Sequence, residues 1–236
     1  MVPREAFDLR SLLNDSIIYS EMLKIQRFVF NMFAVNSYVV SDETKECLFV
    51  DCGAFYPEER AAIRRYVQEE QLKPVALICT HGHLDHVLGN SFLFEEYGLK
   101  AQVHAEDEYL ISNIPEQARS MVGMNYQEQI APIGAYLHST DKIRFGSHQL
   151  EIIHTPGHTP GCVVYYCKEE KVAFTGDTIF NMSIGRTDFP GGSWGQMMQS
   201  LKLLVNLLPK DTTLLTGHGD QTTMNYECQW NPYLKS

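Results

Sequence analysis

The order of apolar and polar residues predicts strands in the first part of the chain. Residues 25–30, 37–40 and 47–50 are apolar and rich in residues that favour strands, and polar turns separate them. Because the three segments follow one another closely, they predict an antiparallel meander.

An amphipathic helix and a buried strand are predicted next. Residues 57–71 carry charges on one side and Ala61, Ile63 and Val67 on the other, which is helical periodicity. Residues 75–79 are continuously apolar, as in a strand buried on both faces. This strand leads directly into Thr80-His81-Gly82-His83-Leu84-Asp85-His86.

The middle of the chain is less regular. Residues 87–97 have a helical pattern that Gly98 ends, so the His- and Asp-rich segment lies on a loop between a strand and a helix. Residues 100–104 predict a short strand and residues 105–111 another helix. Residues 115–136 have no clear period, and we expect loop and helix there, lining a site.

The second half repeats the scheme of the first. Residues 149–154, 162–167 and 172–175 are strand-like. Ser193 is placed to cap a helix, and residues 212–216 predict a last buried strand.

Two halves with a similar order of strands and helices predict the fold class. We expect an α/β protein in which two mixed sheets pack face to face with helices outside, an αββα four-layer sandwich. A length of 236 residues fits one such domain. The expected domain covers residues 1–236, with its core at about 24–219 and a short helical C-terminal segment at 220–236.

Composition and charge exclude several classes of protein. Hydrophobic residues make up 44% of the chain and charged residues 20%, as in ordinary globular proteins. A formal net charge of −10 provides no basic stripe for a nucleic-acid backbone. Residues 1–10 are charged rather than signal-like, and no apolar run is long enough to span a membrane. We therefore expect no nucleic-acid or membrane partner and a cytoplasmic location, while no feature of the sequence sets an oligomeric state.

The cysteines are even in number, but neither the length of the chain nor its start favours a disulfide framework. No CxxC pair occurs. We expect reduced thiols, most of them buried, at Cys47, Cys52, Cys79, Cys162, Cys167 and Cys228.

Four potential metal ligands lie within one short segment. In an extended chain, residues two apart point the same way, so His81 and His83 can reach one ion together. Asp85 and His86, at the start of the following helix, would point toward a second position. Gly82 lets the backbone turn tightly beside the ions. Packing alone does not explain so many polar groups at one strand end, because each needs a partner when buried.

This His-x-His-x-Asp-His motif resembles the signature of the metallo-β-lactamase superfamily. His158 in His-Thr-Pro-Gly-His, Asp177 in Thr-Gly-Asp-Thr and His218 in Gly-His-Gly follow in the order that this family shows. The resemblance implies two divalent ions, zinc first, with iron or manganese as alternatives. It implies one ion on His81, His83 and His158, a second on Asp85, His86 and His218, and a bridging Asp177.

Some polar residues have more than one interpretation. Asp177 could instead form a turn after Gly176. Asp51 resembles a family aspartate behind the site and could orient a ligand or form a turn. The remaining histidines match no motif and are interpreted as surface or satisfied residues: His104, His138, His148 and His154.

Within the superfamily, the chain most resembles the short single-domain glyoxalase II-type hydroxyacylglutathione hydrolases. Residues 178–180, 184–192 and 217–219, followed by 222–223 and 231–232, carry that resemblance. The stretch Gly185-Arg186-Thr187-Asp188-Phe189 also resembles the persulfide dioxygenases, which are mononuclear iron enzymes and the runner-up. β-Lactam cleavage is less expected, because zinc lactamases usually carry a cysteine in place of Asp177. The alternative from another class is a metal-binding interaction module without catalysis. Such modules usually lack some of the metal ligands, whereas this chain has all of them.

The resemblance implies a thioesterase that cleaves S-2-hydroxyacylglutathione-like thioesters, a small-molecule substrate. Two ions can share a water, lower its pKa and supply hydroxide beside a polarised carbonyl. Asp85 and Asp177 could accept a proton, although both are first of all ligands. Arg186 could hold a substrate carboxylate or pair with Asp188. Full-length relatives bind glutathione through a C-terminal helical domain whose residues have no counterpart here, so weak substrate binding is expected.

Overall fold

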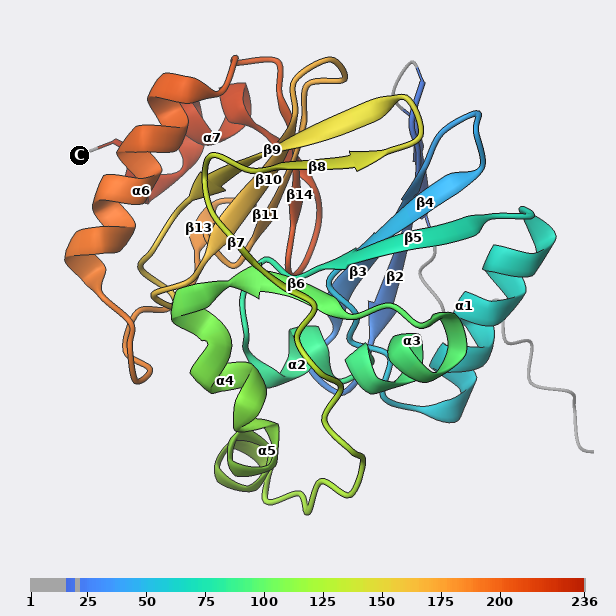
Figure 1. Ribbon diagram of the computed structural model, residues 1–236. Helices are drawn as coiled ribbons and strands as arrows, with labels where there is room; N and C mark the ends of the chain where they lie inside the picture. The colour runs from blue at the N-terminus through green and yellow to red at the C-terminus, as the bar shows by residue number, and fades with distance from the viewer. Residues whose placement is uncertain (1–15, 20–21, 236) are drawn as a thin grey trace, which may run out of the picture.

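The computed structural model describes residues 16–19 and 22–235, which build two facing β-sheets (Figure 1). The first sheet contains β1 (Ser16–Tyr19), β2 (Lys24–Phe30), β3 (Val35–Ser41), β4 (Glu46–Val50), β5 (Lys73–Ile78), β6 (Ala101–His104) and β7 (Ala135–Leu137), in that order. Residues 1–10, where no signal-like stretch was found, lie outside the described residues.

The second sheet has the order β15-β14-β11-β10-β9-β8. Its strands are β8 (Lys142–Phe145), β9 (His148–His154), β10 (Val163–Cys167), β11 (Val172–Gly176), β14 (Thr213–Thr216) and β15 (Thr222–Thr223). A separate hairpin joins β12 (Ile179–Phe180) to β13 (Ser183–Ile184).

Both sheets are mixed, as predicted. The pairs β2-β3 and β3-β4 are antiparallel, which confirms the meander, whereas β4-β5, β5-β6 and β6-β7 are parallel. In the second sheet only β11 and β14 pair in parallel. β5 belongs to the first sheet and β11 and β14 to the second, and the loops that follow these three strands meet at one end of the two facing sheets.

Helices cover the outer faces of the two sheets (Figure 1). They are α1 (Pro57–Glu69), α2 (Leu84–Val87), α3 (Asn90–Tyr97), α4 (Glu108–Ser112), α5 (Ile114–Val122), α6 (Trp194–Leu207) and α7 (Met224–Trp230), with 3-10 turns η2 (Ala105–Asp107) and η3 (Pro232–Leu234). The helices from α1 to α5 lie on the side of the first sheet, and α6 and α7 pack on the second.

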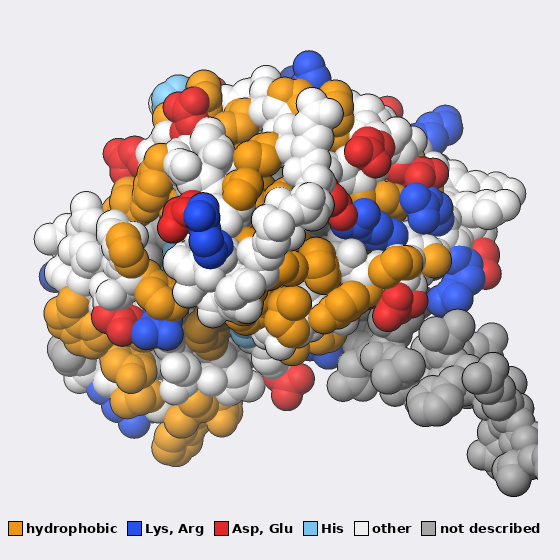
Figure 2. Space-filling model, turned by 90° about the horizontal axis from the view of Figure 1, so that it is seen from below, with side chains coloured by type: hydrophobic (Ala, Val, Ile, Leu, Met, Phe, Trp, Pro, Cys, Tyr) orange, Lys and Arg blue, Asp and Glu red, His pale blue; other side chains and the backbone are white. Residues whose placement is uncertain are grey.

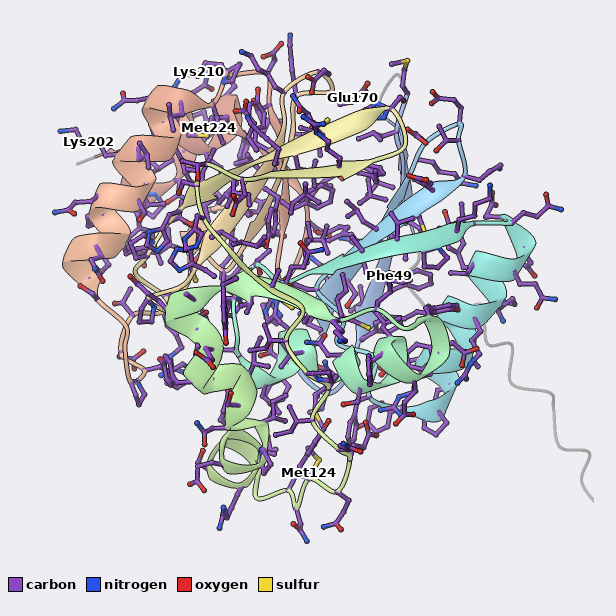
Figure 3. All side chains as sticks on the ribbon, viewed as in Figure 1. Phe49, Met124, Glu170, Lys202, Lys210 and Met224 are labelled. Atoms are coloured by element: carbon purple, nitrogen blue, oxygen red, sulfur yellow. The ribbon has the colours of Figure 1, made fainter. Side chains whose placement is uncertain are left out.

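Three hydrophobic clusters hold the four layers together. One joins α1 and α3 to the first sheet and includes Phe49, a second joins the two sheets, and a third joins the second sheet to α6 and α7 and includes Met224 (Figure 3). Side chains from both sheets meet in the second cluster, where Tyr38 and Phe174 pack edge to face with ring centroids 5.4 Å apart. This layering confirms the predicted αββα sandwich.

The start of α1 shows how local sequence sets a helix. Pro57 occupies the first turn, and the Glu59 carboxylate accepts hydrogen bonds from the backbone N–H groups of Phe55 and Tyr56 at 2.8 and 2.9 Å. The predicted inner face was slightly wrong, because Ala62 is buried beside Ile63 and Val67 whereas Ala61 is exposed.

The predicted helix over residues 87–97 is interrupted. It divides into α2 and α3 at Gly89, whose backbone N–H donates to the Cys52 carbonyl at 2.8 Å. A Cβ at Gly89 would overlap the Cys52 thiol, so the close approach of the two chain segments requires glycine there. Gly98 ends α3 in the left-handed conformation with φ 71°, as its position predicted.

Other elements differ in detail from the prediction. Residues 105–111 form η2 followed by α4 instead of one helix, and the segment without a clear period contains α5 and β7. Ser193 caps α6 by accepting from the Gln196 backbone N–H, as predicted. The six cysteines are free thiols, as expected, and five of them are buried.

The surface of the molecule mixes charged and apolar side chains. On the face in Figure 2, Lys and Arg side chains are interspersed with Asp and Glu and form no continuous basic band, while hydrophobic side chains lie between them. Among the described residues, no helix has the length and apolar character needed to cross a bilayer.

Candidate metal centre

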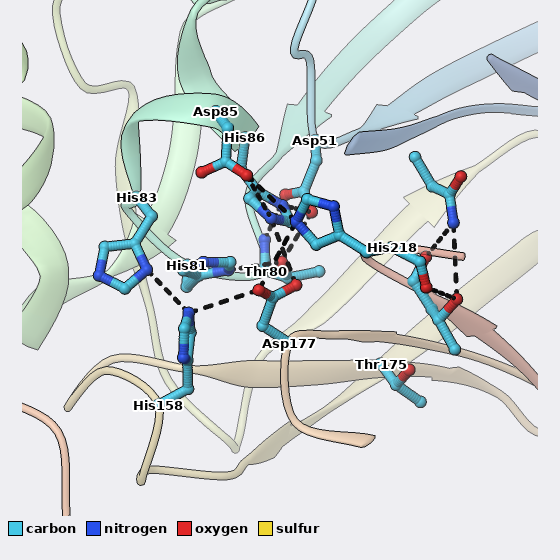
Figure 4. A network of polar contacts seen from close by, with 12 residues as sticks. Asp51, Thr80, His81, His83, Asp85, His86, His158, Thr175, Asp177 and His218 are labelled. Atoms are coloured by element: carbon cyan, nitrogen blue, oxygen red, sulfur yellow. Dashed lines mark hydrogen bonds and ion pairs between the residues drawn. The ribbon is translucent and has the colours of Figure 1, made fainter. Parts of the chain in front are cut away.

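The seven predicted ligands come together where β5, β11 and β14 end, and six of them are buried (Figure 4). Thr80 begins the ligand-bearing loop, and its backbone N–H and hydroxyl both donate to the Asp51 carboxylate at 2.7 Å. These bonds fix the turn from β5 into α2. His218 is held from the other side by an isolated bridge between its backbone and that of Val35.

One group of possible ligands consists of His81, His83 and His158, which we call the first subsite. Nδ1 of His83 lies 2.8 Å from Nε2 of His158. The rings of His81 and His83 are nearly perpendicular, with centroids 4.9 Å apart. Their nitrogens therefore converge from different directions, as ligands around one ion do.

The second subsite consists of Asp85, His86 and His218. Oδ2 of Asp85 lies 3.1 Å from Nε2 of His218 and 3.6 Å from Nε2 of His86. Asp85 and His86 both come from α2, on the turn that directly follows His83. The one short helix therefore carries two of these three groups.

Asp177 lies between the two subsites. Its Oδ1 is 3.3 Å from Nε2 of His86, and its Oδ2 is 3.4 Å from Nε2 of His158 and 3.7 Å from Nε2 of His218. The carboxylate thus faces both groups at once, which is the position of a bridging ligand. The two subsites match the division expected from the sequence, and a further group of possible ligands, His81, His86 and Asp177, joins them.

Several polar atoms in this cluster fit a metal ion. Nε2 of His81, Nε2 of His86 and Oδ1 of Asp177 are buried and form no hydrogen bond among the described residues, although the last two face each other at 3.3 Å. Buried polar atoms without a partner are costly, and a cation would satisfy all three. A Cβ at Gly217 would overlap Oδ1 of Asp177, so glycine leaves the space that the carboxylate occupies.

Three of the histidines have their outer nitrogens fixed by other groups. In His81, Nδ1 lies 3.2 Å from the Thr80 hydroxyl. Nδ1 of His86 lies 2.8 Å from Oδ2 of Asp51, and Nδ1 of His158 donates to the Arg186 carbonyl at 2.7 Å. These bonds leave Nε2 of each ring to face the centre. Asp51 has a φ of 56°, in the left-handed region, and its carboxylate contacts the His86 ring, which agrees with the interpretation that it orients this side chain.

The loop before and after His218 is held by two side chains that the sequence pattern does not single out. Nδ2 of Asn36 donates to the carbonyls of Thr216 and Gly219, both at 2.9 Å, and the Tyr38 hydroxyl donates to the Thr216 carbonyl at 2.7 Å. Both side chains come from β3, far from the loop in sequence. Nothing in their local pattern indicates this role, because only the packing of the two sheets brings them there.

The pKa values of the histidines shift in opposite directions in the two subsites. Burial lowers the pKa of His81 well below its usual value and that of His83 to about 3, so both rings are neutral. Burial also acts on His86, but the carboxylates of Asp85 and Asp177 outweigh it and raise the pKa of His86 well above its usual value.

The pKa of His218 is also raised, because the hydrogen bond that its ring donates to Asp85 and the charge of Asp177 outweigh its burial. Burial alone would raise the pKa of both carboxyl groups, yet the adjacent His86 lowers it for Asp85 and for Asp177. The second subsite is thus a set of mutually stabilised charges.

The other histidines lie outside this cluster. His148 is buried, with Nδ1 3.0 Å from Oδ2 of Asp42. Its Nε2 forms no hydrogen bond among the described residues and lies 3.6 Å from Oε1 of Glu170, so the expectation of a satisfied residue holds for one ring nitrogen only. His104 and His154 stack with centroids 4.1 Å apart and an interplanar angle of 16°. They and Glu106 lie close enough to hold an ion, but near-parallel rings do not converge on one point without turning.

A cleft with an apolar rim opens over both subsites. Phe33, Met121, Phe180 and Phe189 line it together with the ligand side chains. Arg186 is the only Lys or Arg among the described residues that line it. Its guanidinium forms two bonds of 2.7 Å with the carboxylate of Asp188 and stacks 4.0 Å from the centroid of the Phe189 ring. Of the two roles weighed for Arg186, the structure shows the pairing with Asp188.

Comparisons with known proteins agree with this geometry. The hydroxyacylglutathione hydrolase GloC of Haemophilus influenzae is 33% identical over 215 residues, which cover 91% of this chain and 99% of that protein. The crystal structure of BLEG-1 B3 metallo-beta-lactamase superposes with a TM-score of 0.82 at 29% identity and covers 91% of this chain and 100% of that one.

The crystal structure of TTHA1623 in a di-iron-bound form superposes with a TM-score of 0.77 at 30% identity, covering 92% of this chain and 100% of that one. A family model for the metallo-beta-lactamase superfamily matches residues 31–218, a range that contains all seven candidate ligands. The chain therefore belongs to the metallo-beta-lactamase superfamily.

Proposed function

We propose that this protein is a dinuclear metal-dependent thioesterase that hydrolyses S-2-hydroxyacylglutathione-like thioesters. The observation that carries the proposal is the pair of adjacent subsites with the Asp177 carboxylate between them. Dinuclear hydrolases use a bridging anion in this position. The similarity to GloC supports the choice of substrate, because it extends over 99% of that hydroxyacylglutathione hydrolase.

The side chains around the cleft suit an acyl thioester. When bound, two divalent ions supply a water of lowered pKa as nucleophile and polarise the carbonyl oxygen. Phe33, Phe180 and Phe189 form an apolar rim that would exclude bulk water from the acyl group. The leaving thiol has a pKa of about 8.5 and departs as thiolate without an obligatory proton donor. No separate general acid is therefore required of the chain.

Asp85 and Asp177 are better suited to ligation than to proton transfer. The adjacent His86 holds the pKa of each carboxyl group below its usual value, although burial acts in the opposite direction. A carboxylate with a low pKa is a weak proton acceptor at neutral pH. We propose both as metal ligands first, with proton acceptance during turnover as a secondary role.

We predict that the protein hydrolyses S-lactoylglutathione with a high KM. Glutathione carries two carboxylates, whereas Arg186 is the only Lys or Arg among the described cleft residues and already pairs with Asp188. Steady-state kinetics with S-lactoylglutathione and a set of other acyl thioesters test this. If the chain binds two zinc ions and hydrolyses none of these thioesters, the thioesterase proposal is contradicted. Metal binding without turnover of any substrate would favour the non-catalytic metal-binding module.

A second prediction separates the two roles of Arg186. If the guanidinium binds a substrate carboxylate, Arg186→Ala should raise KM about threefold to tenfold and change kcat less. Asp188→Asn is the matched variant: it frees Arg186 and should lower KM. If Arg186 only fixes the loop, the two substitutions remove the same pair and should change KM in the same direction.

Metal identity separates the thioesterase from the persulfide dioxygenase alternative. We propose zinc in both subsites, and the di-iron form of TTHA1623 supports iron as the other candidate. Elemental analysis of the purified protein measures identity and stoichiometry. One iron per chain together with oxygen uptake on glutathione persulfide would favour the dioxygenase, since a hydrolase consumes no oxygen.

β-Lactam hydrolysis is a second candidate function. Zinc lactamases usually carry a cysteine in place of Asp177, which argues against this activity. The similarity to BLEG-1 B3 metallo-beta-lactamase, at 29% identity over the whole of that chain, weakens this argument. A chromogenic β-lactam assayed beside the thioester compares the two directly. A larger kcat/KM on the lactam would replace the thioesterase proposal.

A further inference from the structure

A buried carboxylate outside the ligand set joins the two loops that carry the first subsite. Asp107, at the end of η2, is 0% exposed. Its Oδ2 accepts hydrogen bonds from the Gly82 backbone N–H at 2.9 Å and from the Thr159 hydroxyl at 2.7 Å. Its Oδ1 accepts from the Gly161 backbone N–H at 2.7 Å. One side chain therefore connects two segments that are far apart in sequence.

These contacts adjoin the ligands of the first subsite. Gly82 lies between His81 and His83, and Thr159 directly follows His158. A shift of Asp107 would therefore move the backbone of all three histidines relative to one another.

Gln117 on α5 holds the same loop from a second direction. Its Nε2 donates to the Gly82 carbonyl at 3.0 Å and to the Leu110 carbonyl at 2.8 Å, and its Oε1 accepts from the Leu84 backbone N–H at 3.0 Å. Gly82 thus has its N–H bound by Asp107 and its carbonyl bound by Gln117. The segment without a clear sequence period supplies this second contact.

The fit around Asp107 leaves little room for movement. A Cβ at Gly161 would lie 2.6 Å from Cγ of Asp107, and a Cβ at Gly82 would lie 3.0 Å from the Asp107 carbonyl oxygen. Glycine at both positions lets the two backbones close on the carboxylate. The arrangement is a close contact of three chain segments.

The two subsites are supported in different ways. In the second, Asp51 bonds directly to the His86 ring. In the first, the Thr80 hydroxyl and the Arg186 carbonyl contact the rings of His81 and His158, and Asp107 and Gln117 add bonds to the backbone beside the histidines. From these contacts we infer that Asp107 and Gln117 are positioning residues that set the metal affinity of the first subsite. The inference rests on the proposed metal centre and concerns its affinity for ions, independently of the reaction.

The test measures zinc affinity in the full chain by competition with a chromophoric chelator. Asp107→Asn should weaken one of the two zinc sites about 10-fold to 100-fold and change the other less than about threefold, the size seen when groups behind a ligand are replaced. Asparagine is a sharp probe, because its NH₂ group would face a hydrogen-bond donor in either orientation. His83→Ala identifies the weakened site: in that variant, Asp107→Asn should have no further effect on the remaining ion.

Asp42→Asn is the matched control. Asp42 is also a buried carboxylate, and it accepts a hydrogen bond from the backbone N–H of Ser147, in another loop, at 2.7 Å. It differs from Asp107 in its place: Val35, at the start of β3, pairs with His218 of the metal centre, whereas Asp42 follows the other end of that strand. Its replacement should lower the melting temperature and leave both zinc affinities unchanged. A merely structural role for Asp107 would give that same result.

Gln117→Met tests the inference without any change of charge. It should weaken the same zinc site, by less than Asp107→Asn does, and it carries the test if the Asp107 variant does not fold. Unchanged zinc affinity in the Asp107→Asn and Gln117→Met variants, or an equal loss of affinity at both zinc sites, would overturn the inference. A wild-type chain that binds no zinc would instead overturn the proposed metal centre, so the two failures are distinguishable.

Discussion

Replacing Asp177 with alanine is expected to lower kcat on an acyl thioester by about 10³-fold or more and to reduce the occupancy of both metal positions. The carboxylate faces Nε2 of His86 on one side and Nε2 of His158 on the other, at 3.3 and 3.4 Å. Its removal therefore takes a negative group from both subsites. A loss of several kcal/mol of charge stabilisation corresponds to that change in rate.

His83→Ala is the matched variant for this prediction. His83 belongs to the first subsite only, so its replacement should remove one ion, leave the second bound and abolish turnover in a folded chain. Elemental analysis and kinetics of the two variants together give the comparison. If Asp177→Ala kept two tightly bound ions, or if either variant retained near-wild-type hydrolysis, the assignment of these residues would be wrong.

The layers of the fold and the members of the candidate site follow from short-range patterns in the sequence. The continuous apolar run before His81 and the alternating segments at residues 25–50 predicted buried and meander strands, and the structure has β5 and β2-β3-β4 there. The candidate metal ligands at strand ends could be recognised from the sequence, because a buried histidine or aspartate needs a polar partner or an ion. The motif order then placed His158, Asp177 and His218 in one group.

The groups that hold these ligands were not predictable in the same way. Asp107 lies in Glu106-Asp107-Glu108, a run of acids that resembles an exposed helix start, yet only Asp107 is fully buried. Its partners Gly82 and Gly161 come from loops that the sheet topology brings together. Pairings of this kind depend on tertiary packing and leave no periodic trace in the sequence.

The two subsites should respond differently to acid, and this is the second large effect expected. An ion can bind a histidine only after the proton leaves, so a histidine with a raised pKa makes metal binding depend on pH. In the second subsite, burial opposes the protonation of His86 and His218, but the charges of Asp85 and Asp177 raise the pKa of both rings. These two rings therefore keep their protons to a higher pH than an ordinary histidine does, and an ion has to displace those protons.

In the first subsite, burial lowers the pKa of His81 well below its usual value and that of His83 to about 3. No proton has to leave these two rings at any pH between about 5 and 8. The affinity of the second subsite should therefore fall as the pH falls, by up to about 100-fold per pH unit where two protons are displaced, whereas the affinity of the first should fall less steeply.

Acidification from pH 8 to pH 6 should thus release the ion of the second subsite first. Zinc dissociation constants measured by chelator competition across this range give both slopes, and His83→Ala isolates the slope of the second subsite. Proton release on zinc binding at pH 7, measured in a weakly buffered solution, should be larger for His83→Ala than for His218→Ala, because the latter variant has lost one of the two protonated rings. Equal slopes for both subsites, or earlier loss of the ion held by His81 and His83, would contradict the division of charge between them.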